Sequence, residues 1–289
     1  MKFWLFLSYE PPETLLDHAR KAEEYGFEGV AMADHIAIPA NDEVEHPNKY
    51  PVVPEDIFAD QLTSFASMAA VTTRLKFLTF IYVVPIRDPF LVAKQFGSLA
   101  ISSGDRVILG AGAGWLKEEF EALRQDFHSR GKRMDEMLTI MRDFWDDGYA
   151  EFHGEHYDFA RMGMFPVPKQ QVPIWIGGQS RAAARRATNH DGFIAMQAID
   201  QMDRLSDAVR ADFALVDEAR SARGLTGPFH RCVLLNRNVA TWDVDAARRL
   251  AEVEGITDLV VWPWPDSGMP FEQKWRAAAA FAEQVIHRF

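Results

Sequence analysis

The 289-residue sequence predicts a (β/α)8 TIM barrel, in which eight parallel strands close into a cylinder and helices surround it. Two observations predict this fold. Eight short apolar runs are each followed by a helical stretch, and parallel strands need connections of about that length. About 250 residues are typical of such a barrel. Since no linker, charge block or fixed-period repeat marks a boundary, we expect one domain over 1–289. A doubly wound open sheet is the alternative.

The expected elements alternate regularly along the chain. Strands are predicted over 3–7, 29–33, 76–84, 106–111, 172–176, 192–195, 231–235 with an extension to 240, and 258–262. Helices are predicted over 13–25, 58–71, 89–102, a stretch ending at 148 and broken near 129–131, a segment from 180, then 201–223, 243–254 and 271–288. Two insertions interrupt the alternation, at 34–57 after the second strand and at 149–171 before the fifth, where the sequence has hairpin character.

The composition argues against several classes of protein. With 31 basic and 42 acidic side chains the net charge is −11, and the basic residues are scattered, which disfavours nucleic-acid binding. A single cysteine, Cys232, excludes an internal disulfide and fits a reducing compartment. No apolar run reaches the roughly 18 residues of a membrane span, and the first residues lack a signal-peptide pattern. We therefore expect a cytoplasmic enzyme that acts on a small molecule.

In a barrel of this type the chemistry lies at the carboxyl ends of the strands. Asp34 and His35 follow the second run and are the only adjacent acid and imidazole at a strand end. A histidine is suited to proton transfer near neutral pH, so His35 is the candidate catalytic residue. A metal-dependent hydrolase would need several such ligands at different strand ends. Because only His35 qualifies, no metal site is expected.

Two glycine-rich segments follow the fourth and fifth runs. Gly110 to Gly114 either allows strand and helix to pack closely or lets the backbone approach a flat ligand. Gly177 to Ser180 precedes a helix, where free N–H groups suit a phosphate, but an ordinary serine cap fits equally well. The sequence also contains 12% aromatic residues. Four aromatics near strand ends are candidates for a substrate pocket or for the core: Tyr82, Trp115, Trp262 and Trp264.

Several segments in this order resemble the luciferase-like monooxygenase superfamily of flavin- and coenzyme F420-dependent oxidoreductases. The similar segments are 22–30 running into Asp34 and His35, 85–94, 109–120, 130–133, 152–159 and 173–178. The resemblance covers roughly residues 1–195 and is weaker beyond them.

The resemblance implies a barrel with a flat tricyclic cofactor in its mouth, and the family commonly forms dimers. It places the cofactor ring against the end of the third strand, with a non-proline cis peptide near Phe80 and Ile81. His35 corresponds to the residue near the reacting edge of the ring, and Asp34 would bind the ring or orient His35. The family's contacts to the ribityl chain and phosphate would fall on Gly110, Gly112, Gly177, Gly178, Gln179 and Ser180.

The resemblance leaves two cofactors, FMN and F420. Many FMN-dependent relatives carry an arginine where this chain has Ala113, which favours F420. The segment from Tyr50 to an acid at Asp56 or Asp60, together with Trp115, is similar to the F420-dependent subfamily. Sugar-phosphate dehydrogenases of that subfamily carry an acid at the position of Ala113, so that activity is not expected.

The predicted function is hydride transfer between reduced F420 and a small organic substrate. One alternative is an FMN-dependent monooxygenase supplied with reduced flavin by a partner reductase. Another is a flavin- or deazaflavin-binding protein without catalysis.

Overall fold

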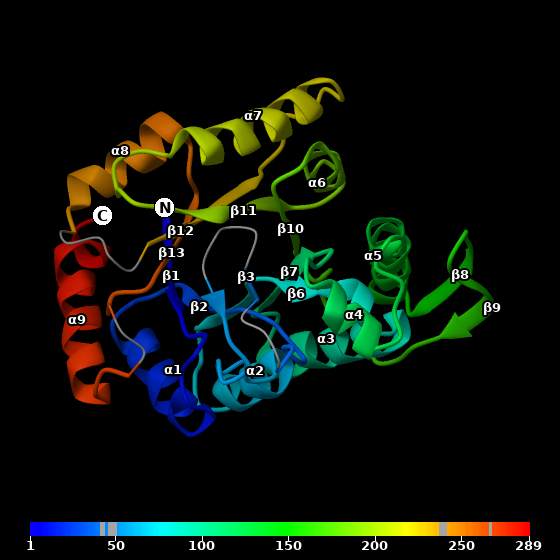
Figure 1. Cartoon of the computed structure of the whole chain (residues 1–289), viewed down its shortest axis with the longest axis horizontal. Helices are drawn as coiled ribbons and strands as arrows, with labels where there is room; N and C mark the ends of the chain where they lie inside the picture. Colours follow the sequence, from blue (N-terminus) through cyan, green and yellow to red (C-terminus); the bar gives the residue numbers. More distant parts are fainter. Residues whose placement is uncertain (41–43, 46–50, 237–241, 266–267) are drawn as a thin grey trace.

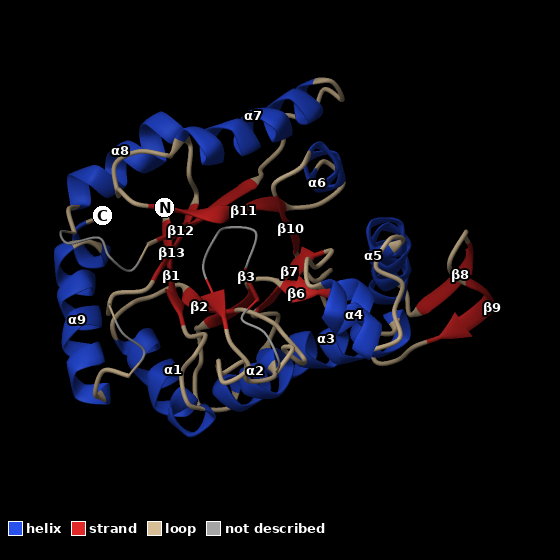
Figure 2. Cartoon of the chain, viewed as in Figure 1, coloured by secondary structure: helices blue, strands red, loops and turns tan. Residues whose placement is uncertain are grey.

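The computed structural model describes residues 1–40, 44–45, 51–236, 242–265 and 268–289. Eight parallel strands pair in chain order, and the pairing of β7 with β10 and of β13 with β1 closes the cylinder (Figures 1 and 2). The strands are β1 (Lys2–Phe6), β2 (Gly29–Met32), β5 (Lys76–Thr79), β7 (Val107–Gly112), β10 (Ile174–Gly178), β11 (Gly192–Ile199), β12 (His230–Leu235) and β13 (Asp258–Val261). The predicted TIM barrel is confirmed, and the open sheet is excluded. The expected extension of the seventh strand beyond 236 lies outside the described residues.

Helices cover the outside of the barrel (Figure 2). They are α1 (Leu15–Glu24), α2 (Gln61–Ala69), α3 (Pro89–Ser103), α4 (Lys117–Ala122), α5 (Arg130–Asp146), α6 (Arg181–Ala187), α7 (Asp207–Ser221), α8 (Val244–Glu254) and α9 (Phe271–Gln284). Two helices begin later than predicted because a side chain caps them. Asp60 accepts a hydrogen bond from Thr63 N at 2.8 Å before α2, and Ser206 accepts one from Val209 N at 3.3 Å before α7. No described helix is long and apolar enough to cross a membrane.

The third strand is interrupted, which the prediction of one strand over 76–84 missed. β5 ends at Thr79, the peptide between Phe80 and Ile81 is cis, and β6 (Tyr82–Val83) then continues beside β7. The cis peptide implied by the resemblance is therefore confirmed. The interruption places Phe80, Ile81 and Val83 around the barrel mouth.

Both insertions contain antiparallel pairs. β3 (Val44–Glu45) pairs with β4 (Pro51–Val52), and β8 (Tyr149–His153) pairs with β9 (Asp158–Gly163). The second pair is the predicted hairpin, and it stands away from the barrel beside α5 (Figure 1).

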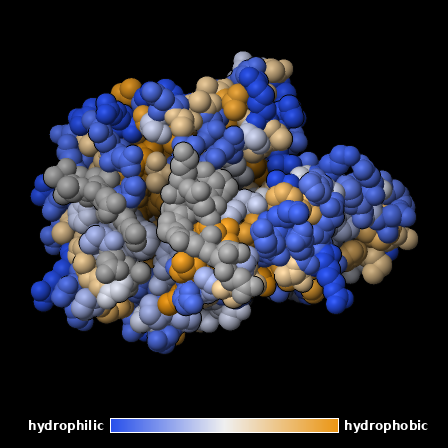
Figure 3. Space-filling view, in the orientation of Figure 1, coloured by the Kyte–Doolittle hydropathy of each residue, from blue (hydrophilic) through white to orange (hydrophobic). Residues whose placement is uncertain are grey.

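Large side chains fill the amino-terminal part of the barrel interior. Trp4 and Trp175 meet edge to face with ring centroids 5.9 Å apart, and Cys232 is completely buried beside them. Asp258 is buried too, and it accepts hydrogen bonds from Trp4 Nε1 at 2.9 Å and pairs with His230 Nδ1 at 2.7 Å. Beyond this filled part, a cavity lies at the carboxyl ends of the strands. The outer surface is largely hydrophilic on the face shown in Figure 3.

Candidate active site

A cavity of about 280 Å³ opens at the carboxyl ends of the barrel strands. This volume is close to the lower end of ordinary small-molecule sites. The lining residues come from the ends of six strands and from the connections after them: Tyr9, Ala33, Asp34, His35, Val52, Phe58, Phe80, Ile81, Val83, Gly112, Ala113, Gly114, Trp115, Arg130, Gly177, Gly178, Gln179, Ser180, Ala183, Arg186 and Met196. His35, the predicted catalytic residue, lines this cavity, and so do nine of the predicted cofactor-binding and pocket residues. They are Asp34, Phe80, Ile81, Gly112, Gly177, Gly178, Gln179, Ser180 and Trp115.

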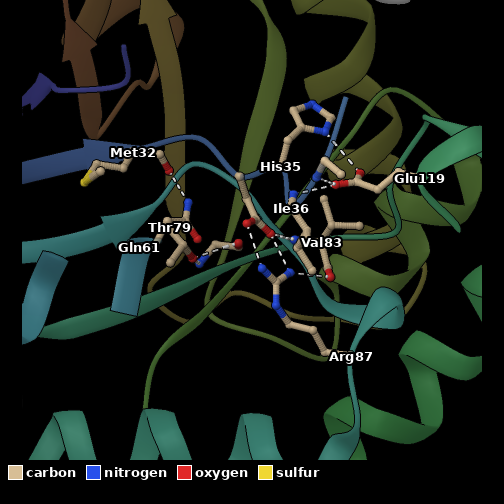
Figure 4. A network of polar contacts seen from close by, with 11 residues as sticks. Met32, His35, Ile36, Gln61, Thr79, Val83, Arg87 and Glu119 are labelled. Carbon is tan, nitrogen blue, oxygen red and sulfur yellow. Dashed lines mark hydrogen bonds and ion pairs between the residues drawn. The ribbon is translucent and has the colours of Figure 1, made fainter. Parts of the chain in front are cut away.

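His35 is held by a residue that the sequence analysis did not single out. Its Nδ1 lies 3.1 Å from Glu119 Oε2, on helix α4 (Figure 4). The other carboxylate oxygen, Oε1, accepts hydrogen bonds from the backbone N–H of Ile36 at 2.5 Å and of Ala37 at 3.2 Å. The Glu119 side chain is 1% exposed and that of His35 is 8% exposed. One buried carboxylate therefore fixes both the imidazole and the loop that carries it.

Asp34 does not have the role in orienting His35 that the sequence suggested. Its oxygens accept two hydrogen bonds from the Arg87 guanidinium, at 2.7 and 2.8 Å, and one from Val83 N at 2.8 Å (Figure 4 draws the contacts of Arg87). Burial opposes the charge on Arg87, but the carboxylate of Asp34 outweighs it and raises the pKa of Arg87. Asp34 thus ties the end of β2 to β6 and to the turn that precedes α3. A contact between Asp34 and a cofactor stays a prediction.

The glycines allow close packing around the strand interruption. A Cβ on Gly112 would lie 1.9 Å from Ile81 Cδ1, and one on Gly177 would lie 2.6 Å from Ile81 Cγ2. A Cβ on Gly110 would meet the Thr79 carbonyl oxygen at 1.9 Å, and Gly110 is absent from the cavity wall. Of the two explanations left open for the segment from Gly110 to Gly114, packing accounts for Gly110 and Gly112 directly. For Gly110 this corrects the predicted cofactor contact.

Two arginines bring positive charge to the cavity wall. Arg130, the first residue of α5, donates to the carbonyl oxygens of Gly114 at 3.1 Å and Phe127 at 2.8 Å. Among the described residues its hydrogen-bond partners are these carbonyls and no carboxylate, and burial lowers its pKa. Arg186, by contrast, is neutralised by Asp135, with Nη2 to Oδ2 at 3.1 Å. Arg130 is therefore a local cation without a described carboxylate partner, which a net charge of −11 made hard to locate from sequence.

Ser180 lines the cavity and precedes helix α6, which carries Arg186. Its hydroxyl oxygen accepts a hydrogen bond from Ala183 N at 3.2 Å and caps α6, as the serine-cap explanation expects. A hydroxyl oxygen that accepts one bond still has its own proton to donate. Ser180 therefore caps the helix and can also donate to an anion in the cavity.

Aromatic rings surround His35 on the cavity wall. The His35 ring meets Phe58 and Trp115 edge to face, with centroids 4.9 and 5.6 Å apart. Tyr9 lines the cavity beside Phe58, and Trp262 stacks behind Tyr9 at 5.7 Å without itself reaching the wall. The wall around His35 is thus built for an apolar or flat molecule.

Two predicted pocket aromatics lie in the core instead. Tyr82 is 2% exposed and packs on Phe96 at 5.2 Å, because side chains alternate along β6 and its neighbours Ile81 and Val83 take the cavity side. Burial raises the pKa of the Tyr82 hydroxyl. Trp264 is completely buried, and its Nε1 donates to Glu10 at 3.2 Å. Trp264 stacks on His18 of α1, outside the barrel mouth.

The described part of the chain contains no cluster of three His, Cys, Asp or Glu side chains arranged to hold a metal ion. What the arrangement offers is a histidine among aromatic rings and an arginine hydrogen-bonded to backbone carbonyls, both on the wall of one cavity. This combination suits an elongated organic ligand with an anionic group and a substrate bound beside it.

The family of the chain agrees with this architecture. Residues 1–278 match the family described as luciferase-like monooxygenase, and the chain belongs to it. The family match therefore extends beyond residue 195, up to which the motifs of the sequence resemble the family. The chain is therefore an oxidoreductase of a family that uses F420 or flavin.

Three similar proteins illustrate the range of this family. The uncharacterized protein Rv0940c of Mycobacterium tuberculosis is 38% identical over 283 residues, which is 93% of each chain. An F420-dependent glucose-6-phosphate dehydrogenase of Gordonia bronchialis is 30% identical over 192 residues, covering 63% of this chain and 52% of that protein. The crystal structure of monooxygenase RslO1 from Streptomyces bottropensis has a TM-score of 0.76 at 20% identity, covering 100% of this chain and 99% of that one.

Proposed function

We propose that the chain is an F420-dependent oxidoreductase that transfers hydride between reduced deazaflavin and a small organic substrate. The observation that carries the proposal is the Arg130 guanidinium on the cavity wall, bonded only to neutral carbonyls among the described contacts. A partly buried cation without a carboxylate favours an anionic ligand. F420 carries its negative charge away from the reacting ring, and this suits a cavity whose wall holds both the candidate proton-transfer residue His35 and the Arg130 guanidinium.

The residues present fit such a cofactor. Arg130, Ser180 and Arg186 would bind the phosphate, and Ile81 would lie beneath the ring system. When bound, F420 supplies a carbon centre that carries hydride. His35 exchanges a proton with the substrate, while Trp115 and Phe58 shape the space around it. Ala113 lines the cavity where many FMN-dependent relatives have an arginine, which supports F420 over FMN.

The substrate is proposed to be an uncharged alcohol or carbonyl compound. The wall near His35 consists mainly of aromatic and aliphatic side chains, and both described arginines of the cavity lie with the predicted phosphate site. The Gordonia relative is named for glucose 6-phosphate, but Ala113 offers no group for polar recognition at its position. Turnover of glucose 6-phosphate as the best substrate would contradict this part of the proposal.

Titration of the purified protein with F420 and with FMN, followed by fluorescence, tests the cofactor. F420 is expected to bind more tightly, and Arg130→Met is expected to weaken its binding by about tenfold or more, because a charged hydrogen bond contributes about 1.5–3 kcal/mol. Arg161→Met is the matched control, since Arg161 stacks on Tyr149 in the hairpin, at 4.4 Å from the ring centroid. Tight FMN binding with no F420 binding would overturn the proposal and favour a monooxygenase that depends on a reductase partner.

A further inference from the structure

We propose that Glu119 is a positioning residue that holds neutral His35 as its Nδ1–H tautomer, so that Nε2 faces the cavity as a proton acceptor. The inference deepens the proposed function, because it rests on His35 as the proton-transfer group. It adds the atom that receives the proton and the residue that prepares it.

The hydrogen bonds of Glu119 determine which atom is the donor. A carboxylate only accepts hydrogen bonds. Its Oε1 accepts from two backbone N–H groups, Ile36 and Ala37, whose direction cannot be reversed. Its Oε2 lies 3.1 Å from His35 Nδ1. Because Oε2 can only accept, Nδ1 must carry the proton that it donates. A neutral imidazole has one N–H group, so Nε2 then carries no proton.

The surroundings of the ring keep this orientation. Phe58 and Trp115 meet the imidazole edge to face, at interplanar angles of 76° and 87°. A flipped ring would leave the buried Glu119 carboxylate without its third donor, which is costly at 1% side-chain exposure. The neighbouring charges, Asp34 and Arg87, neutralise each other through two hydrogen bonds. Glu119 is therefore the carboxylate that acts on His35.

The proton inventory of the step is simple. When a substrate hydroxyl is deprotonated, its O–H bond breaks and an Nε2–H bond forms, which gives an imidazolium with its second proton on Nδ1. The Glu119 carboxylate at 3.1 Å stabilises that cation. In the opposite direction the same proton returns to the oxygen of the substrate.

The test is the Glu119→Gln variant. The amide oxygen must stay where two backbone N–H groups donate, so the amide nitrogen faces Nδ1 and becomes a donor. His35 must then accept at Nδ1 and carry its proton on Nε2, which inverts the tautomer. Glu118→Gln is the matched control, because Glu118 is the exposed neighbour on the same helix.

Two readouts distinguish this role from a merely structural one. In the full chain labelled with 15N-histidine, the His35 signals are assigned by their loss in His35→Gln. At a pH where the ring is neutral, wild type and Glu118→Gln are expected to show protonated Nδ1, and Glu119→Gln protonated Nε2. In turnover assays we expect Glu119→Gln to lower kcat by ~10²-fold or more while the Kd for F420 changes less than about twofold. Glu119→Asp should recover part of kcat.

Protonated Nε2 in the wild type would overturn the proposal, even if Glu119→Gln failed to fold. So would Glu119→Gln with wild-type tautomer and kcat. Because the nitrogen signals are recorded without cofactor, they test Glu119 even if F420 binding, and with it the proposed function, fails.

Discussion

The ion pair between Asp34 and Arg87 gives a prediction about stability that can be worked out from its geometry. The pair is bidentate, with the side chain of Asp34 5% exposed and that of Arg87 15% exposed. Arg87 also lies 3.9 Å above the Tyr82 ring. Arg87→Met removes the guanidinium and leaves a buried carboxylate with Val83 N as its remaining donor. Breaking a buried pair from one side costs about 3–5 kcal/mol.

That loss can be converted into a melting temperature. An unfolding entropy of about 2.1 cal/mol/K per residue gives roughly 0.6 kcal/mol/K for a chain of 289 residues. Arg87→Met should therefore lower Tm by about 5–8 °C, and urea unfolding should show the loss directly. The double variant Asp34→Asn with Arg87→Met should recover part of the stability, because no charge is left unpaired. A loss below about 1 kcal/mol in Arg87→Met would refute the reasoning.

Three further predictions concern two titratable groups whose pKa is shifted by burial and the buried tyrosine Tyr82. Burial, and then the charge of Arg142, lowers the pKa of His190 from 6.5 to about 4, so an NMR titration should give a midpoint near 4. Since the unfolded chain takes up this proton first, stability should fall as the pH drops from about 6.5 toward 4, and His190→Asn should reduce that fall. Burial raises the pKa of Asp212 to about 6, so Asp212→Asn should raise Tm at pH 7–8 more than at pH 4, whereas Glu218→Gln on the same helix should not. Tyr82→Phe should change KM by less than about twofold, while Trp115→Ala, on the cavity wall, should raise KM. Equal effects of the two substitutions on KM would indicate that Tyr82 contacts the substrate.

The barrel could be predicted from the sequence because its signals are local. Apolar runs and helix caps repeat along the chain. Once the strands are assigned, the residues that follow each strand are expected at the same mouth of the barrel. Asp34 and His35 were found for this reason, since they are adjacent and follow a strand directly. The cis peptide between Phe80 and Ile81 was implied only by the resemblance, and the interruption after Thr79 was missed because the apolar residues over 76–84 have the pattern of one continuous strand.

The residues that the sequence did not reveal depend on contacts between distant segments. Glu119 is 84 positions from His35 and is one of two adjacent glutamates on a short helix, a pattern typical of a solvated face. Tyr82 and Trp264 were placed wrongly because an aromatic residue near a strand end does not reveal its side of the wall. Side chains alternate between the two faces of a strand, and this alternation points Tyr82 toward α3. Trp264 is enclosed because α1 and α9 pack around it.

Anaerobic turnover is the most direct test of the central claim. Reduced F420 and a panel of small uncharged ketones are mixed with the protein and with His35→Gln, and reoxidation of the cofactor is followed by absorbance. The account predicts oxygen-independent turnover by the wild type, and a ~10²- to 10⁴-fold slower rate in His35→Gln at an unchanged Kd for F420. Equal rates in both proteins, or turnover only with reduced FMN and oxygen, would contradict it.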